Sequence, residues 1–121
     1  MKIIKIEEYI TLETPYPGAP FRRHLLTNEH KAENFGGLFV GLHPGERVQY
    51  HYHKKRECFF VVISGEGTAI IEDKEITLKA NDIMYIPSGE KHAIVNRTDK
   101  YFRYLEFFNY PPIDSDFIAV K

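Results

Sequence analysis

Short apolar runs alternate with turn-forming residues along most of the chain, and helical periodicity is weak. Strands rich in β-branched and aromatic residues are expected at residues 3–6, 9–12, 21–27, 36–43, 47–53, 59–63, 68–72, 75–78, 83–87, 93–96 and 101–108. The prolines in residues 14–20 lack the N–H donor that a strand ladder needs, so this segment is expected to be a loop. Many short strands at close intervals predict an all-β protein, either a sandwich or a barrel.

Length and charge bound the architecture and the partners. A chain of 121 residues is expected to form one domain, residues 1–121, with residues 1–20 peripheral or forming dimer contacts. Sixteen Lys and Arg balance 17 Asp and Glu, which argues against a nucleic-acid partner. The first residues contain no long apolar stretch, so no membrane span or signal peptide is expected. A single cysteine excludes an internal disulfide and fits a cytoplasmic protein.

Two histidines on one strand, His51 and His53, are the first candidates for chemistry. Residues i and i+2 of a strand point to the same side, with Cα atoms ~7 Å apart. Two imidazoles at that spacing can converge on one ion at ~2.1 Å from each nitrogen. A bare pair could equally occupy a solvated strand face, so the case depends on the neighbouring residues.

Those neighbours form two ordered motifs. The first covers residues 45–65: Gly45, five residues, His51 and His53, three more residues, Glu57, and finally Gly65. The second covers residues 81–96 and contains Asn81, Pro87, Gly89, His92 and Asn96. A Pro-x-Gly turn before His92 would deliver that side chain rigidly, because proline fixes φ and glycine permits the turn.

Together the two motifs resemble those of the cupin superfamily. Asn81 stands where the family has glycine, a mild change because asparagine tolerates the left-handed backbone region. The resemblance implies a small double-stranded β-helix, that is, a jelly-roll barrel with a ligand at its mouth. It also implies one divalent metal ion, Fe, Mn, Zn, Ni, Co or Cu, held by His51, His53, Glu57 and His92.

The sequence offers two candidates for the fourth ligand. Seven residues separate Glu57 from Gly65, whereas the family usually has six, and this count places Cys58 in the glutamate position. Strand parity also turns Cys58 inward unless a bulge re-aims Glu57. A third arrangement leaves both residues unbound, as in the three-histidine site of the thiol dioxygenases. Glu57 is the preferred candidate and Cys58 the alternative, although a buried cysteine is more often a small core residue.

The resemblance favours a metal-dependent enzyme of the dioxygenase, isomerase or lyase type that acts on a small polar metabolite. One alternative is a cupin that binds a small ligand without turnover. Another is a metal-free cupin like the sugar-nucleotide isomerases and epimerases, which the intact set of three histidines disfavours. A homodimer is expected, with strand 2–6 covering its exposed edge against a second copy.

Several other residues carry smaller expectations. Arg47 and Gln49 share the parity of His51 and could line the pocket. Arg103 and Glu106 have opposite parity on the last strand, so one of them is expected to face inward, with salt-bridging the more common role. Asn96 is expected to brace a turn. Three histidines outside the motifs are expected at the surface: His24, His30 and His43.

Overall fold

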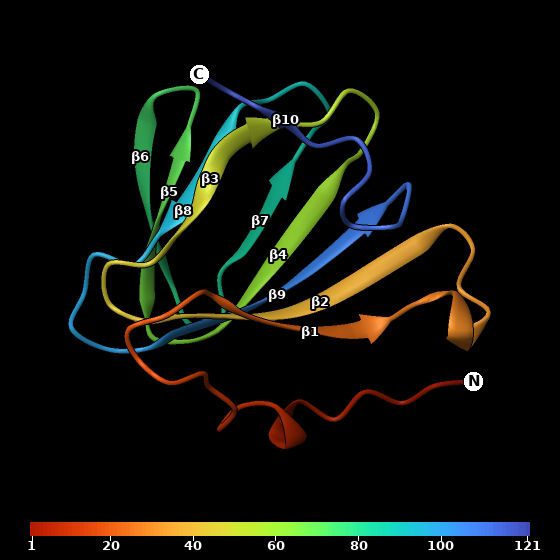
Figure 1. Ribbon diagram of the computed structural model, residues 1–121, viewed down its shortest axis with the longest axis horizontal. Coiled ribbons are helices and arrows are strands. Elements are labelled where there is room, and N and C mark those ends of the chain that lie inside the picture. Colours follow the sequence, from red (N-terminus) through yellow and green to blue (C-terminus); the bar gives the residue numbers. More distant parts are fainter.

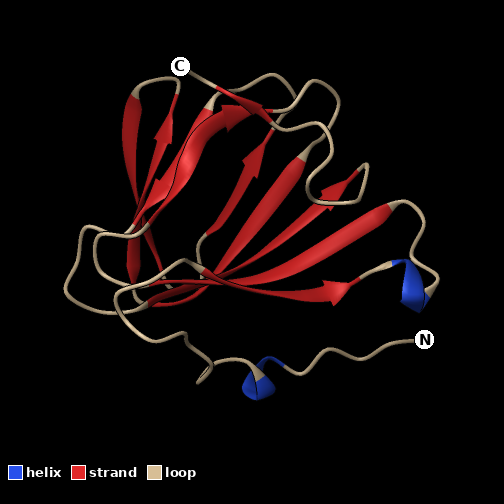
Figure 2. Ribbon diagram, viewed as in Figure 1, coloured by secondary structure: helices blue, strands red, loops and turns tan.

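The computed structural model describes residues 1–121, which form two antiparallel β-sheets (Figures 1 and 2). The strands are β1 (Phe21–Leu26), β2 (Phe35–Leu42), β3 (Arg47–Tyr52), β4 (Cys58–Ser64), β5 (Glu66–Ile71), β6 (Lys74–Lys79), β7 (Ile83–Ile86), β8 (His92–Val95), β9 (Phe102–Asn109) and β10 (Ile118–Ala119). Two short 3-10 helices, η1 (Ile6–Glu8) and η2 (Asn28–His30), precede β1 and β2. The expectation of an all-β double-stranded β-helix is confirmed.

Each sheet has five strands. The first has the order β1-β2-β9-β4-β7 and the second the order β10-β3-β8-β5-β6. Apolar side chains that alternate along the strands meet between the sheets and form the main core. Its buried members are Leu38, Val40, Leu42, Cys58, Phe60, Val62, Ala69, Leu78, Ile86, Ile94, Phe102, Tyr104 and Phe108. Some of these residues also line the cavity between the sheets, namely Leu38, Val40, Phe60, Ile94 and Tyr104.

The turns of the two motifs adopt the backbone that their residues favour. Gly65 and Gly89 have φ angles of 81° and 85°, and Asn81 has a φ of 74°. Asparagine is one of the few residues that enters this left-handed region readily, so it replaces the usual glycine without a new fold. A Cβ atom at Gly65 would lie within 2.4 Å of the Tyr101 carbonyl oxygen, so no larger residue fits there.

The two strands expected at residues 3–6 and 9–12 are absent, so that prediction was wrong. Residues 6–8 form η1 instead, and Tyr9 donates its N–H to the Ile6 carbonyl at 2.8 Å. The apolar side chains that suggested strands, Ile4, Ile6 and Tyr9, pack on an outer cluster of Leu25, Phe39 and Leu105. Figure 1 shows this N-terminal segment running along the outside of the sheet that carries β1.

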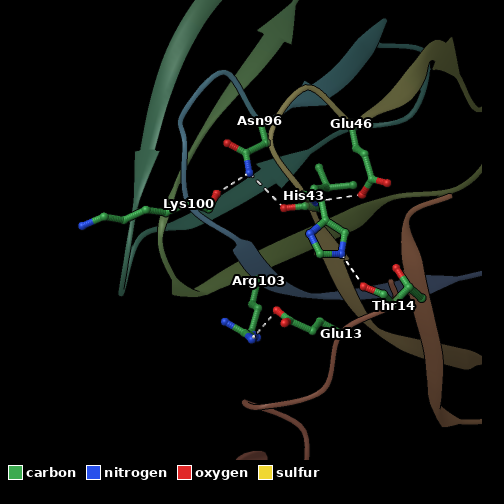
Figure 3. Close-up of polar contacts among 8 residues, drawn as sticks. Glu13, Thr14, His43, Glu46, Asn96, Lys100 and Arg103 are labelled. Atoms are coloured by element: carbon green, nitrogen blue, oxygen red, sulfur yellow. Dashed lines mark hydrogen bonds and ion pairs between the residues drawn. The ribbon is translucent and has the colours of Figure 1, made fainter. Parts of the chain in front are cut away.

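His43 is not a surface residue, contrary to the prediction. It is 8% exposed and its Nε2 lies 2.5 Å from the Thr14 carbonyl oxygen (Figure 3). Its ring packs edge-on against Tyr101. Glu13 pairs with Arg103 at 3.5 Å beside it. His43 therefore fixes the end of the N-terminal segment to the barrel. His24 and His30 are exposed, as expected.

Asn96 braces a turn, as predicted. Its Nδ2 donates to the carbonyls of Leu42 and Lys100 at 2.9 and 2.7 Å (Figure 3). Its Oδ1 accepts from Thr98. The structure contains no helix with the length and apolar character that a membrane span requires.

The segment that follows β9 lies against the barrel. After β9, residues 110–117 cross the mouth of the barrel, and β10 then pairs with β3 through Ile118–Tyr52 and Ala119–His51 (Figure 1). We call residues 109–117, which begin at the last residue of β9, the C-terminal strap. The two-residue strand β10 is too short to leave a periodic signal in the sequence.

Candidate metal centre

The structure brings His51, His53 and His92 together at one end of the barrel. His51 lies on β3 directly opposite His92 on β8, and His53 follows β3 by one residue. All three are buried, and one ligand atom of each lies within 4.8 Å of the others. The ring centroids of His51 lie 4.3 Å from His92 and 4.8 Å from His53. The three imidazoles thus form a cluster that could hold one ion.

Each imidazole has its Nδ1 atom beside a backbone carbonyl. The distances are 2.5 Å from His51 to Gln49, 2.6 Å from His53 to Asp116 and 2.9 Å from His92 to Glu90. Because a carbonyl can only accept a hydrogen bond, each Nδ1 carries the proton and each Nε2 keeps a lone pair. Outer partners of this kind fix the tautomer and orientation of metal-binding histidines.

One of the three Nε2 atoms is an unpaired buried acceptor. His53 Nε2 is inaccessible to solvent and has no hydrogen-bond partner in the protein. A buried polar atom without a partner costs free energy, on the order of 1–3 kcal/mol. A divalent cation would satisfy this lone pair together with those of His51 and His92, so the residues present fit a metal ion.

The electrostatics of the cluster also favour neutral imidazoles. Burial lowers the pKa of His51 to about 3, with the neighbouring His92 adding to the shift. Burial likewise lowers the pKa of His92 to about 4 and lowers the pKa of His53. Metal ions bind the deprotonated ring, so these side chains need not lose a proton at neutral pH before they bind.

The histidines open into a cavity of about 320 Å³ between the two sheets. Its apolar lining consists of Leu38, Val40, Val48, Phe60, Ile94, Ile113 and Phe117. The polar lining residues besides the histidines are Arg22, Arg56, Tyr104, Glu106 and Asp114. An apolar pocket with a few convergent polar groups is typical of a site for a small molecule.

Glu106 has the most perturbed carboxyl in this cavity. It lies on β9 opposite Leu38 of β2 and Phe60 of β4, both of which also line the cavity. Burial raises the pKa of Glu106 to about 7, although the cations of Arg56 and Arg22 oppose the shift. A carboxyl with a pKa near neutrality can both take and give a proton at physiological pH.

Glu57 does not reach the three histidines, which corrects the preferred assignment of the fourth ligand. The side chain is exposed, and its carboxylate accepts a hydrogen bond from the Tyr85 hydroxyl. Its backbone N–H donates to Asn109 Oδ1 at 2.7 Å. No bulge re-aims it, because β4 begins at the next residue and its first residues pair regularly with β7 and β9.

Cys58, the alternative fourth ligand, faces inward as strand parity predicted, but it also lies outside the histidine cluster. It is 2% exposed and packs within the main hydrophobic core. Burial raises the pKa of its thiol well above the ordinary value, so it stays protonated. Cys58 is a small core residue here, so neither Glu57 nor Cys58 lies at the histidine cluster.

The prediction that Arg47 and Gln49 line the pocket was wrong. Both residues are exposed, and Val48 lines the cavity instead. The pairing of β3 with β8 shifts between Val48 and His51, and this irregularity reverses the alternation before the first histidine. On β9, the prediction that one of Arg103 and Glu106 faces inward is confirmed. Glu106 lines the cavity, and Arg103 pairs with Glu13 outside it.

Sequence reasoning missed Arg22 and the strap residues of the cavity, Ile113, Asp114 and Phe117. Arg22 pairs with Val40 of β2, a core residue, so alternation along β1 could have placed it inward. The strap residues follow no periodic pattern, and only the fold brings them to the histidines.

Comparison with known proteins gives a consistent picture. Residues 38–108 match the family model described as the cupin domain. An oxalate-binding protein from Thermotoga maritima is 34% identical over 76 residues, which is 60% of this chain and 61% of that protein. The chain therefore spans about three-fifths of the length of this curated relative.

Two solved structures share the architecture. A protein with a double-stranded β-helix domain from Klebsiella pneumoniae superposes with a TM-score of 0.78 at 27% identity, over 100% of this chain and 99% of that one. A sugar phosphate isomerase of the cupin superfamily from Silicibacter pomeroyi has a TM-score of 0.66 at 27% identity, over 75% of this chain and 60% of that one.

Proposed function

The chain belongs to the cupin family, and we propose that it is a metal-dependent enzyme acting on a small polar metabolite. His51, His53 and His92 would hold one divalent ion, whereas Glu57 and Cys58 would not. The observation that carries this proposal is the set of three buried imidazoles, each with Nδ1 at a carbonyl. His53 Nε2 is left without any other partner.

Three nitrogen ligands are compatible with several divalent metal ions and do not select one of them. Imidazole suits Fe, Mn, Co, Ni, Cu and Zn, and the absence of Cys58 from the cluster removes the thiolate that would favour Zn or Cu. Three protein ligands also leave coordination positions open to a substrate, as in catalytic sites. A bound ion would supply Lewis-acid chemistry by polarising a substrate oxygen.

Other residues of the cavity would transfer a proton, attract the substrate and exclude water. Glu106 would hold or release a proton beside the substrate, because its pKa of about 7 populates both forms near neutrality. Arg22 supplies a positive charge in the cavity that would attract an anionic group of the metabolite. The apolar walls would exclude bulk water from the reacting atoms.

A binding protein without turnover is the second candidate. The observation in its favour is the similarity to a Thermotoga maritima protein that is named for binding oxalate. A metal-free isomerase is the third candidate, and the sugar phosphate isomerase from Silicibacter pomeroyi shares the fold. The unpaired buried nitrogen of His53 argues against a metal-free site.

We also propose a homodimer, but through a different surface from the one expected. The strand predicted at residues 2–6, whose edge was to be covered, is absent. Exposed apolar side chains instead lie on neighbouring strands of the first sheet: Phe59 is 44% exposed, Ile83 70% and Tyr85 56%. Light scattering should give twice the mass of 14.2 kDa, and Ile83→Glu should give the monomer.

Metal content decides between these functions. Protein purified without a histidine tag or chelator is expected to carry one divalent ion per chain. Oxygen uptake on moving the anaerobic protein into air would then indicate an oxygenase. A stoichiometric ion without oxygen uptake would favour the isomerase, lyase or binding roles. Metal-free protein that cannot be loaded would contradict the proposal.

A further inference from the structure

The C-terminal strap touches the metal centre at two of its three histidines. The Asp116 carbonyl accepts from His53 Nδ1 at 2.6 Å, and the Phe117 ring stacks on His51 with centroids 4.2 Å apart and planes 19° apart. The cupin match ends at residue 108, so the strap lies outside the part of the chain that the family model describes.

Asp116 holds the segment that follows His53 from two sides. Its carboxylate accepts the backbone N–H groups of Lys54 and Lys55 at 2.7 Å each and that of Arg56 at 3.0 Å. Its own carbonyl points to the His53 ring. The φ angle of 52° is a left-handed conformation that aspartate tolerates better than most residues. One residue thus fixes both the loop and the ring.

Arg56 locks the rest of the strap against the barrel. Its guanidinium is buried, with the side chain 1% exposed, and it lies 4.5 Å above the Phe108 ring. It is satisfied by strap carbonyls at 2.7 to 3.2 Å rather than by a carboxylate; the acceptors are Asn109, Tyr110, Pro112 and Ile113. A planar fork of donors makes this arrangement possible for arginine and not for lysine.

The cavity wall depends on the same segment. Ile113, Asp114 and Phe117 all line the cavity that contains the histidines. Phe117 is 42% exposed and its ring stacks on His51. The ring therefore lies between the His51 side of the site and solvent. A displaced strap would remove this wall and the outer partner of His53 in one movement.

We propose that the strap contributes to metal binding. Asp116 is a positioning residue for His53, and Phe117 closes the site over His51. This inference rests on the proposed function, since it assigns these residues a role toward an ion held by the histidines. It extends that function by making metal affinity depend on residues outside the cupin motifs.

The first test compares Asp116→Asn with the control Asp99→Asn. The control removes the same charge from an exposed residue in the loop that follows β8. Asparagine keeps the left-handed backbone but cannot accept three N–H bonds as a carboxylate does. Competition with a coloured chelator should show Co(II) affinity about tenfold weaker in Asp116→Asn, the usual effect of losing an outer-shell partner. The Co(II) visible spectrum should change as well, and Asp99→Asn should match the wild type in both.

A second readout needs no metal. Long-range ¹H–¹⁵N spectra of the metal-free wild type should show His53 protonated at Nδ1, and Asp116→Asn should show a mixture of tautomers. A third variant, Phe117→Ala, leaves every strap hydrogen bond in place. It should keep the Co(II) spectrum but release the ion to chelator several-fold faster.

The outcomes separate the two proposals. If the wild type binds Co(II) and both strap variants keep its affinity, release rate and His53 tautomer, the strap proposal is overturned while the proposed function stands. If the wild type binds no Co(II), the proposed function fails and takes the role of the strap with it. Weaker Co(II) binding with an altered His53 tautomer in Asp116→Asn supports both.

Discussion

The two ends of the chain are both irregular, both lie outside the cupin match, and differ in what they cover. The N-terminal segment packs Ile4, Ile6 and Tyr9 on the outer face of the first sheet. The C-terminal strap packs over the mouth of the barrel and contributes to the cavity of the histidines. One end buries apolar surface far from the chemistry, and the other arranges polar groups around it.

The two segments are also held to the barrel by different kinds of contact. The N-terminal segment is held by apolar contacts, with polar anchors only at Glu13 and Thr14. The strap is held by the buried guanidinium of Arg56 and by the carboxylate of Asp116. Apolar contacts tolerate small shifts, whereas directed hydrogen bonds fix geometry. We therefore expect changes under the N-terminal segment to lower stability alone, and changes at the strap to lower metal affinity as well.

The largest expected loss of stability lies on the outer face. Phe39 is fully buried beneath the N-terminal segment, with its ring centroid 5.6 Å from that of Tyr9. Phe39→Ala should lower the free energy of unfolding by about 3–5 kcal/mol, through lost burial and a cavity. Urea unfolding measures the loss. Co(II) affinity of the folded variant should equal that of the wild type, and a tenfold change would show that the outer face also controls metal binding.

Arg56 is the corresponding residue at the strap. Arg56→Met keeps much of the side-chain volume but leaves several strap carbonyls without a donor, and it should cost about 2–4 kcal/mol of stability. Unlike Phe39→Ala, it should also weaken Co(II) binding about tenfold, because the strap would no longer hold His53. Arg56→Lys is the control for charge, and it should restore only part of either property. A variant that loses stability but keeps full metal affinity would show that the strap is only structural.

Acid should destabilise the metal-free protein through the mouth of the barrel. His51 and His92 have folded pKa values of about 3 and about 4, below the ordinary value of 6.5. The unfolded chain therefore binds more protons as the pH falls below 6.5, and each histidine should remove about 1 kcal/mol of stability between pH 7 and pH 5.5.

Glu106 acts in the opposite direction over the same range. Its folded pKa of about 7 lies above its ordinary 4.5, so it stabilises the folded state as the pH falls from 7, by about 1–2 kcal/mol. Urea unfolding in chelator at pH 7 and 5.5 should thus show a small loss for the wild type and about 2 kcal/mol for Glu106→Gln. Equal losses in the two proteins would refute the assignment of a raised pKa to Glu106.

The smallest effect is expected at the anchor of the N-terminal segment. His43→Gln removes the ring contact with Tyr101 and alters the hydrogen bond to the Thr14 carbonyl. One hydrogen bond contributes about 1 kcal/mol, so the change in unfolding free energy should be of that size. Limited proteolysis should cut residues 1–13 faster in this variant, while metal affinity stays constant.

The sequence predicted the barrel and the histidine cluster for the same reason. Strand alternation and the spacing of His51, His53 and His92 are local or motif-bound signals, and Asn81 behaved as its backbone preference indicated. Prediction failed where tertiary contacts decide. Ile4 and Ile6 look like strand residues but satisfy their apolar character against a sheet face. His43 is buried by a segment 29 residues earlier.

The site shows the same limit. The irregular pairing between Val48 and His51 reverses parity in a way that no local residue announces. Glu57 has the right spacing for a ligand, but its exposed carboxylate accepts a hydrogen bond from the Tyr85 hydroxyl instead. Asp116 is 63 residues from His53, so their contact exists only once the barrel has formed.

The assignment of the three histidines as ligands can be tested by measuring metal stoichiometry in a set of single variants. His51→Ala, His53→Ala and His92→Ala should each lose most of the one divalent ion per chain expected in the wild type. Glu57→Gln, Cys58→Ser and the surface control His24→Ala should keep it. Equal metal content in all six variants, or loss of the ion in Glu57→Gln with retention in His92→Ala, would contradict a centre built by three histidines.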